Sequence, residues 1–310
     1  MIVASKREKM CYYLYLIPAF VCFGIFIFWP TIQSFYLSLY KYSLSDTKGI
    51  YKGLENYVGS TGLFSDKIFW KNMKNTGVFT LFTVPCAMVI GLMLAVMVYS
   101  KLIKFKSFYK VAMYIPYVSS MVAVASVFRI LFNANPSNSV VNQLFKEIVD
   151  FINRIIPQLQ LVAPKVDWLG KPHWAMFVII LVSMWKSLGY IMIIYLGGLC
   201  GISDDVYEAA DLDAVTPWKR LTKITVPLLK PTTFFLLATE TISSFQVFTP
   251  VNIITNGGDP FGSTSTLITY LYNEGFKGLN GMGKASSIAV IIFAILSILT
   301  VIQKKMTDED

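Results

Sequence analysis

Long apolar runs, separated by short polar segments, follow one another along the whole chain. A spanning helix needs about 20 mostly apolar residues, and an unpaired charge within it is costly, so charge-poor runs of this length predict transmembrane helices. The pattern therefore predicts an all-α integral membrane protein. The six predicted spans cover approximately residues 11–39, 75–100, 111–132, 174–200, 232–254 and 285–303.

The first apolar run follows a basic tail, Lys6 to Lys9, and so invites comparison with a signal peptide. The apolar region of a signal peptide has about 7 to 15 residues, whereas this run is roughly twice as long and lacks a small-residue cleavage pattern. We therefore expect a retained anchor. Trp29-Pro30 is expected to mark its outer interface, because tryptophan favours the headgroup level and proline suits a loosening helix.

The polar segments between the runs are too short to form independent globular domains, so residues 1–310 are predicted to form a single transmembrane domain. Basic residues normally accumulate on the cytoplasmic side of a membrane. With both termini placed in the cytoplasm, the number of lysine and arginine residues is the same on the two sides of the membrane. Only the short loop from Lys101 to Lys110 favours an orientation with both termini in the cytoplasm.

The composition agrees with burial in a membrane. Hydrophobic residues make up 55% of the chain, charged residues make up 15%, and the mean hydropathy is +0.58. These values exclude disordered, coiled-coil and disulfide-rich secreted proteins. A net charge of +9 would suggest a nucleic-acid partner for a soluble protein. Beside membrane spans, anionic lipid accounts for the charge, so no nucleic acid is expected.

Residue patterns typical of enzymes and metal sites are missing from the sequence. It contains one histidine, His173, and its four cysteines form no CxxC pair, so no catalytic residue, metal or cofactor is predicted in this chain. Residues 278–285 fit GxxxxGK but end in Ala285, where a nucleotide-binding loop carries Ser or Thr. If transport is driven by ATP, the ATPase must be another subunit.

The polar segment 201–231 is predicted to fold as two short helices at the membrane surface. Ser203 suits an N-cap position before Asp204 and Asp205, and Pro217 suits the first turn of a second helix. The segment carries too many acids and bases for a lipid-seeking face. We therefore expect it to contact a protein partner with basic pockets.

Within this segment, Glu208-Ala209-Ala210 and the following Asp213-Ala214 resemble the EAA loop of binding-protein-dependent ABC importer permeases. Other stretches resemble the carbohydrate-uptake subfamily related to the maltose and glycerol-phosphate transporter permeases. These stretches are residues 53–57, 167–172, Trp185 with Gly189, 255–260 and 282–287. The resemblance covers nearly the whole chain.

The resemblance implies a type I ABC importer permease fold, multi-pass in the bacterial cytoplasmic membrane. Residues 201–231 would be the cytoplasmic coupling segment between spans four and five, which implies that both termini are cytoplasmic. The implied partners are a second homologous permease, two copies of an ATPase that binds ATP and magnesium, and an extracytoplasmic solute-binding lipoprotein or periplasmic protein.

The ATPase-coupling residues that the resemblance implies are Glu208, Ala209, Ala210, Asp213 and Ala214. Glu208 is expected to meet a basic group of the ATPase, and the two adjacent alanines are expected to let the helix seat closely. Ala214 stands where the family pattern has glycine. A turn that requires positive φ is therefore expected either to take another form or to cost about 1 kcal/mol.

Polar side chains inside spans are expensive and usually mark a pathway or a partner. Lys186 and Glu240 are expected either to pair with each other or to face a water-filled cavity. Nearby hydroxyl, amide and aromatic side chains suit a sugar, although each could equally join two helices. The candidate solute-pathway residues are Trp185, Lys186, Tyr190, Glu240, Ser243, Ser244 and Gln246.

The predicted function is the permease subunit of a carbohydrate importer, with an oligosaccharide as the favoured solute. One alternative is a permease for glycerol phosphate or a polyol. A phosphate-bearing solute would require cationic groups in the cavity, and Lys186 is the sole candidate. An alternative of another class is a membrane scaffold without a transport role.

Overall fold

The computed structural model describes most of the chain, and it describes side chains from residue 15 to residue 307. The described residues are 6–42, 49–100, 103–133, 135–278 and 281–308. Lys101, from the basic loop, and the side chains of the basic tail and of Cys11 lie outside this part.

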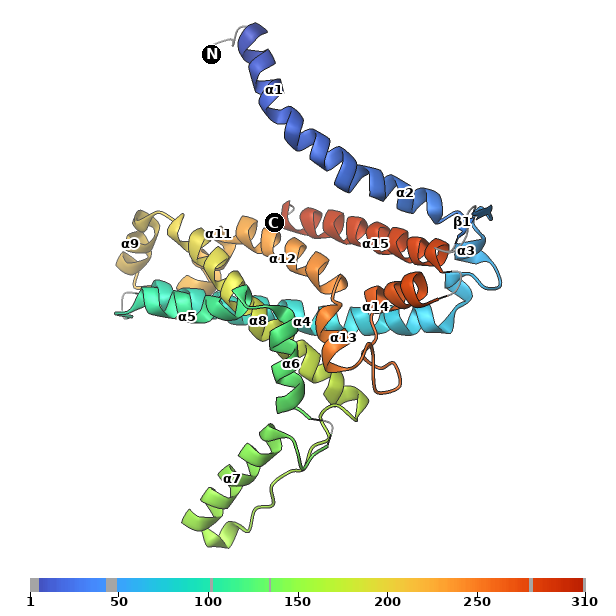
Figure 1. Ribbon diagram of the computed structural model, residues 1–310. Helices are drawn as coiled ribbons and strands as arrows, with labels where there is room; N and C mark the ends of the chain where they lie inside the picture. The colour runs from blue at the N-terminus through green and yellow to red at the C-terminus, as the bar shows by residue number, and fades with distance from the viewer. Residues whose placement is uncertain (1–5, 43–48, 101–102, 134, 279–280, 309–310) are drawn as a thin grey trace. The chain divides into compact units, whose positions relative to one another are not determined.

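The chain is mostly helical and divides into two compact units (Figure 1). The first unit comprises residues 1–67 and 271–294, and the second comprises residues 68–270 and 295–310. In the described part of the first unit, β1 (Tyr40–Lys41) and β2 (Ile50–Tyr51) form a short antiparallel pair.

The first unit begins with a continuous helical rod. α1 (Lys6–Phe23), a π-helical turn (Gly24–Phe28) and α2 (Trp29–Leu37) follow one another without a break. The N–H of Trp29 donates to the carbonyl oxygen of Gly24, which widens the helix just before Pro30. Pro30 has no N–H to donate, and the π turn lets the helix continue to Leu37 despite this missing hydrogen bond. The helix is thus widened but unbroken at Trp29-Pro30, and that these residues mark the outer interface stays a prediction.

The other elements of the first unit are short, apart from the helix that ends the chain. They are α3 (Glu55–Val58), a 3-10 turn (Leu63–Ser65), the end of α14 (Leu267–Tyr272), a π turn (Asn273–Lys277) and the first part of α15 (Met282–Asp308).

The start of α15 docks on the backbone that follows α2. A Cβ atom on Gly283 would lie 1.9 Å from the carbonyl oxygen of Tyr40, so only glycine fits there. Asn56 Nδ2 donates to the carbonyl oxygens of Ser38 (2.7 Å) and Tyr40 (3.0 Å). Ser287 Oγ also donates to Ser38 O, at 3.2 Å. Two of the stretches that carried the family resemblance, residues 53–57 and 282–287, are thus joined through one backbone segment.

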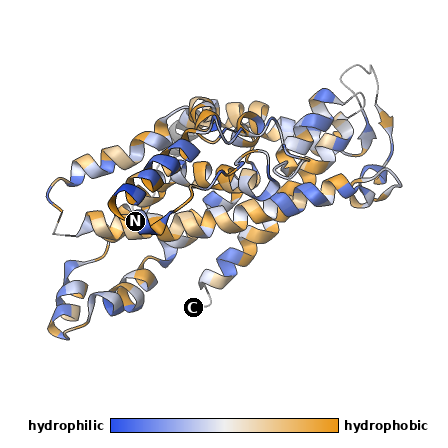
Figure 2. Ribbon diagram, turned by 90° about the horizontal axis from the view of Figure 1, so that it is seen from below, coloured by the Kyte–Doolittle hydropathy of each residue, from blue (hydrophilic) through white to orange (hydrophobic). Residues whose placement is uncertain are grey.

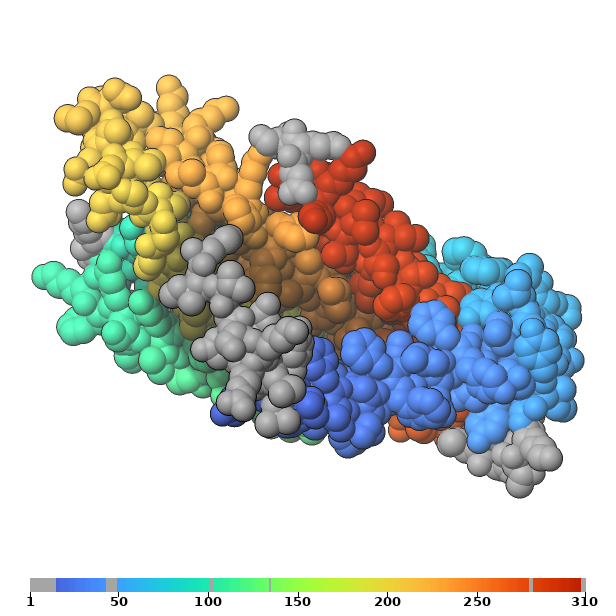
Figure 3. All heavy atoms as spheres, turned by 90° about the horizontal axis from the view of Figure 1, so that it is seen from above, coloured from blue at the N-terminus to red at the C-terminus, as the bar shows by residue number. Residues whose placement is uncertain are grey.

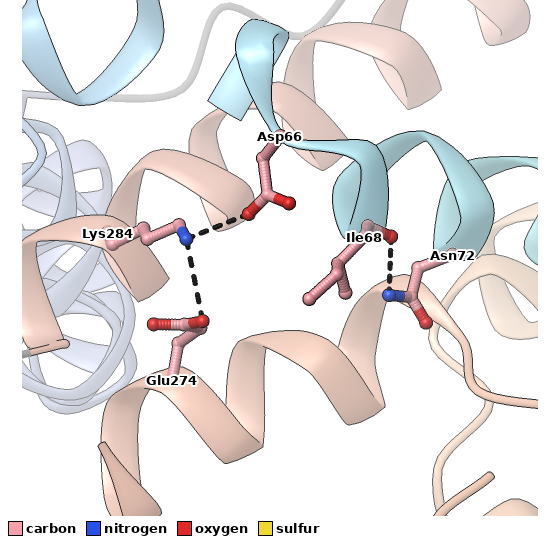
Figure 4. A network of polar contacts seen from close by, with 5 residues as sticks. All are labelled: Asp66, Ile68, Asn72, Glu274 and Lys284. Carbon is pink, nitrogen blue, oxygen red and sulfur yellow. Dashed lines mark hydrogen bonds and ion pairs between the residues drawn. The ribbon is translucent and has the colours of Figure 1, made fainter. Parts of the chain in front are cut away.

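An ion-pair cluster fixes the same helix start. Lys284 Nζ lies 2.9 Å from Asp66 Oδ2 and 3.5 Å from Glu274 Oε1 (Figure 4). The separate bond drawn there, from Asn72 Nδ2 to the carbonyl oxygen of Ile68, belongs to the second unit. The lysine of the GxxxxGK-like stretch is held by two carboxylates, which gives it a structural role.

α4 (Lys67–Tyr99) and α8 (Pro172–Cys200) form the centre of the second unit. Buried apolar side chains from both helices, among them Ala87 and Tyr195, meet in one core cluster. A Cβ atom on Gly91 would lie 2.5 Å from Ile191 Cγ2, so the two helices approach closely there. The hydropathy colouring shows that apolar residues make up much of the helical ribbon (Figure 2).

The predicted third span is broken. α5 (Lys106–Val118) and α6 (Met121–Leu131) meet at an angle of 91°. The backbone between them leaves the helical conformation at Ser119 and Ser120. α5 packs directly on α8, because a Cβ atom on Gly189 would lie 2.0 Å from the carbonyl oxygen of Met113. The prediction of one helix over residues 111–132 is therefore wrong.

The predicted fifth span is also interrupted. α12 (Lys230–Phe245) ends before Gln246, and α13 (Thr249–Ile254) begins after a gap of three residues. Pro250 has no N–H to donate to the carbonyl oxygen of Gln246, four residues earlier, which disfavours one continuous helix across this point. The prediction of one helix over residues 232–254 is wrong in this respect.

In the described part of the chain, four helices are long and apolar enough to cross a membrane, and up to five if α5 with α6 counts as one span. The four are Tyr15–Leu37, α4, α8 and Met282–Thr307 of α15. The multi-pass character of the protein follows from these helices, although the predicted number of six is not reached by length and composition alone.

A helix that the sequence analysis did not predict lies in the segment between α6 and α8. Ser139 is the N-cap of α7 (Val140–Ile155), and its side chain accepts from the N–H of Asn142. A 3-10 turn (Pro157–Leu159) follows the helix. The buried Asn142 side chain donates to the carbonyl oxygen of Val166 at 2.8 Å and accepts from Trp168 Nε1 at 2.9 Å. These bonds tie the start of α7 to the segment that leads into α8.

Candidate functional site

Segment 201–231 forms the helical hairpin that the sequence predicts. It contains α9 (Asp204–Leu212), α10 (Pro217–Arg220), a π turn (Leu221–Thr225) and α11 (Val226–Leu228). Ser203 Oγ accepts from the N–H of Asp205 at 3.3 Å, which confirms the predicted N-cap.

α9 ends in a Schellman motif. The N–H of Val215 donates to the carbonyl oxygen of Ala210 at 3.0 Å, and the N–H of Ala214 donates to that of Asp211 at 3.1 Å. Ala214 has a φ of 49°. The turn therefore keeps the conformation that suits glycine, at a cost of about 1 kcal/mol for the alanine side chain.

Side-chain contacts hold the two arms of the hairpin together. Arg220 Nη1 lies 2.7 Å from Asp211 Oδ1, and the Arg220 guanidinium lies 5.4 Å from the centre of the Tyr207 ring. The Tyr207 ring lies 6.3 Å from that of Tyr99, the last residue of α4. The Tyr207 and Thr225 hydroxyl oxygens are 3.4 Å apart. These contacts fix the hairpin to the end of α4.

Four of the five predicted coupling residues lie on the exposed surface of the hairpin, and these are Glu208, Ala209, Asp213 and Ala214. Ala210 is only 4% exposed and lies on the buried side of α9. That these five residues couple the protein to an ATPase stays a prediction. The side chains of this region form part of the surface in Figure 3, in yellow.

Two apolar side chains that the sequence analysis did not single out share this exposed surface. Leu212 is 88% exposed and Trp218 is 67% exposed. Large apolar side chains at a charged surface are typical of a protein contact. Their position within a dense run of charges was the signal that could have revealed them.

A cavity of about 440 Å³ lies in the second unit. Its wall combines side chains from α4, α5, α6, α8 and α12 with the segment that follows α12. Six of the seven predicted solute-pathway residues line it, and these are Lys186, Tyr190, Glu240, Ser243, Ser244 and Gln246. That they contact solute stays a prediction.

Trp185 is the predicted residue that does not line the cavity. Its side chain is 40% exposed, and its ring lies 5.4 Å from that of Phe128 on α6. Consecutive residues of a helix point about 100° apart, so Trp185 and Lys186 do not face the same way.

Lys186 does not pair with Glu240 in the described structure, although both line the cavity. Its ammonium donates to the carbonyl oxygens of Pro116 (3.2 Å) and Tyr117 (2.6 Å) and lies 5.5 Å from the centre of the Tyr117 ring. These carbonyl groups end α5, where the break at Ser119 leaves them without helical donors. Lys186 therefore caps the broken helix, and of the two predicted alternatives the cavity-facing one describes the structure.

Two hydroxyl groups in the cavity wall have no hydrogen-bond partner in the described structure. Thr83 Oγ1 and Ser183 Oγ are both buried and unpaired, and the Thr83 residue is only 5% exposed. Unpaired polar groups in a protein interior are uncommon and costly. Their position in the wall suits a bound polar molecule. Each lies in a mostly apolar run that holds further hydroxyl residues, so the sequence did not distinguish them from groups that join helices.

Aromatic rings form another part of the wall. The rings of Tyr117 and Tyr190 are stacked, with centres 4.9 Å apart and planes inclined by 14°. Tyr190 was predicted from the sequence and Tyr117 was not. By contrast, the Ser244 hydroxyl is engaged with Thr80 Oγ1 at 3.0 Å and with the carbonyl oxygen of Thr241 at 2.9 Å, as in a bond between helices.

The described residues hold no group of three or more His, Cys, Asp and Glu side chains that could bind a metal ion. The features of interest are therefore a polar cavity within an apolar bundle and an exposed charged hairpin at the end of α4.

Comparison with known proteins gives one family match, to the family described as "Binding-protein-dependent transport system inner membrane component", over residues 69–308. The chain is 30% identical to the lactose transport system permease protein of Rhizobium radiobacter, over 98% of this chain and 97% of that protein. It is 27% identical to the arabinooligosaccharides transport system permease protein of Bacillus subtilis (strain 168), over 97% of this chain and 89% of that protein.

A solved structure has the same fold. A chain from the crystal structure of a bacterial ABC transporter involved in the import of the acidic polysaccharide alginate superposes with a TM-score of 0.76 at 22% identity. The match covers 98% of this chain and 96% of that chain.

Proposed function

Because this chain belongs to the family of binding-protein-dependent transport system inner membrane components, we propose that it is the permease subunit of an ATP-driven ABC importer for carbohydrate. It is a transport protein, and ATP hydrolysis belongs to a separate subunit. The observation that carries the proposal is the polar cavity inside the second unit, with its unpaired hydroxyl groups.

An oligosaccharide is the favoured solute. The relatives named for lactose and for arabinooligosaccharides support a sugar. The cavity, at about 440 Å³, falls within the range of about 300 to 1,000 Å³ usual for small-molecule sites. Its hydroxyl groups suit the hydroxyls of a sugar, and the Tyr117–Tyr190 pair suits the apolar face of a sugar ring.

The proposed topology has six crossings of the bacterial cytoplasmic membrane. The bent pair α5–α6 serves as the third, and α12 with α13 serves as the fifth. Both termini and the hairpin of α9 and α10 lie in the cytoplasm. The exposed charges of the hairpin support this placement, because they suit an aqueous protein partner better than lipid.

The permease works with four partner chains. A second homologous permease completes the pathway, two copies of an ATPase bind ATP and magnesium, and an extracytoplasmic lipoprotein or periplasmic protein delivers the solute. Glu208, whose carboxylate has no partner in the described structure, meets a basic group of the ATPase. Closure of the ATPases moves α9, and the Tyr207–Tyr99 contact passes that movement to α4, whose Thr83 lines the cavity.

The test is reconstitution of the complete complex in liposomes. Sugar-loaded binding protein is expected to raise the rate of ATP hydrolysis severalfold and to drive sugar uptake. A membrane scaffold predicts ATP hydrolysis that is indifferent to the loaded binding protein. Uptake of a phosphorylated solute in preference to a neutral sugar would favour the glycerol-phosphate alternative.

A further inference from the structure

The wall of the cavity carries two charged side chains, Lys186 and Glu240, among the residues that line it. They differ in how they are engaged. The Lys186 ammonium is held by two carbonyl oxygens at the end of α5. The Glu240 carboxylate makes no hydrogen bond or ion pair in the described structure.

This difference decides which charge a solute meets. The carboxyl end of a helix carries negative partial charge, so the carbonyl groups of Pro116 and Tyr117 offset the charge of the lysine that caps them. The ammonium also uses two of its three N–H donors in hydrogen bonds to these two carbonyl oxygens. Glu240 has no such compensation, and its carboxylate is the charge left open to the cavity.

We propose that Glu240 determines the charge class of the solute, so that this wall of the cavity excludes anionic sugars and accepts neutral or cationic ones. The inference rests on the proposed function, because it takes the cavity as the path of the solute. The carboxylate accepts hydrogen bonds from sugar hydroxyls, while Thr83 and Ser183 offer hydroxyl groups that can also donate. A phosphate or a carboxylate of a solute would find a like charge and no free cation on this wall.

The experiment measures the charge preference of the cavity directly, in the detergent-solubilised complete complex. A reporter, Ser243→Cys, lies one helical turn from Glu240 and lines the same cavity. It is placed in a background in which the four native cysteines are serine. Mass spectrometry follows its reaction at pH 8 with a cationic (trimethylammonium-ethyl) and an anionic (sulfonatoethyl) methanethiosulfonate. Val162→Cys, at a site 90% exposed in the segment between α7 and α8, corrects for the intrinsic rates of the reagents.

With Glu240 present, the corrected ratio of cationic to anionic rates is expected to exceed the ratio in Glu240→Gln by about tenfold, the scale of one unit charge acting over several ångströms at an intermediate dielectric constant. Glu240→Asp keeps the charge and is expected to keep most of the preference. Lys186→Met is expected to retain or increase it.

Equal ratios in the reporter protein that retains Glu240 and in its Glu240→Gln variant would overturn the proposal, as would a preference for the anionic reagent. A reporter that neither reagent reaches would also overturn it, because the proposal requires a wall that solutes in water can reach. The reagent ratio does not depend on transport. A complex that shows the cation preference but no sugar-dependent ATP hydrolysis would refute the proposed function alone, and the reverse outcome would refute only the role of Glu240.

Discussion

Ala214 adopts a backbone conformation that costs glycine little and alanine more. The Schellman bonds at the end of α9 require a residue with positive φ there, and Ala214 meets that requirement at 49°. The exposed side chain makes no packing contribution that would offset the strain. The hairpin is thus less stable than its geometry allows.

Ala214→Gly is therefore expected to raise the free energy of unfolding by about 0.5 to 1 kcal/mol, because it relieves this strain. The measurement is thermal unfolding of the purified subunit, where the midpoint should rise by roughly 1 to 3 °C. Ala209→Gly, at an exposed position inside α9, should lower stability by about 1 kcal/mol. The same sign of change in both variants would contradict the assigned turn.

The buried hydroxyl groups of Thr83 and Ser183 have no hydrogen bond to lose in the described structure. Thr83→Val combined with Ser183→Ala is expected to leave thermal stability unchanged or slightly raised. If these hydroxyls bind the solute, sugar uptake by the reconstituted complex should show a KM raised about fivefold or more.

Thr76→Val is the matched control, because Thr76 Oγ1 donates to the carbonyl oxygen of Asn72 at 2.8 Å and accepts from the N–H of Leu267 at 3.0 Å. It should lose stability. A Thr83–Ser183 double variant that is destabilised as strongly as Thr76→Val would show that its hydroxyls have a structural role.

At the scale of elements, the hairpin was predictable because its limits depend on local chemistry. A serine before two aspartates begins α9, and Pro217 begins α10, whatever the rest of the chain does. The cavity residues on α8 and α12 were also accessible from the sequence, since a polar side chain in an apolar helix turns away from lipid.

The breaks within the third and fifth spans were not predictable in the same way. Both segments are mostly apolar and long enough to cross a membrane, and the bend at Ser119 is stabilised by Lys186, which lies on another helix. α7 was not predicted because the segment between α6 and α8 mixes apolar and charged residues. It therefore contains no long apolar run of the kind that predicts a span. The pattern of long apolar runs therefore predicts neither long-range contacts nor short amphipathic helices.

The hairpin as an element carries the proposed contact with the ATPase. Glu208→Ala is expected to reduce co-purification of the ATPase severalfold while membrane insertion stays intact, because the side chain is exposed and bonds to nothing within the described structure. Glu147→Ala, an exposed acid on α7, is the control and should have no effect. Unchanged co-purification for Glu208→Ala would count against the docking role.

At the scale of the whole molecule, the proposed topology places two highly exposed positions on opposite sides of the membrane. Val162 is 90% exposed between α7 and α8, and Leu212 is 88% exposed in the hairpin. In a cysteine-free background, Val162→Cys should react with a membrane-impermeant thiol reagent in intact spheroplasts. Leu212→Cys should react only after the membrane is permeabilised. The reverse pattern would invert the orientation and remove the basis for ATPase docking.

The docking of α15 on the backbone after α2 also bears on how the protein is made. The carbonyl oxygen of Ser38 accepts from Ser287 Oγ, a residue 249 positions later, and the N–H of Gly283 donates to the carbonyl oxygen of Tyr42. During synthesis, Ser38 therefore receives this donor only after the ribosome has added another 249 residues. α2 must therefore remain in the insertion machinery or in lipid without this contact until α15 has been made. A chain released earlier would leave the backbone after α2 without its α15 contacts and open to membrane proteases.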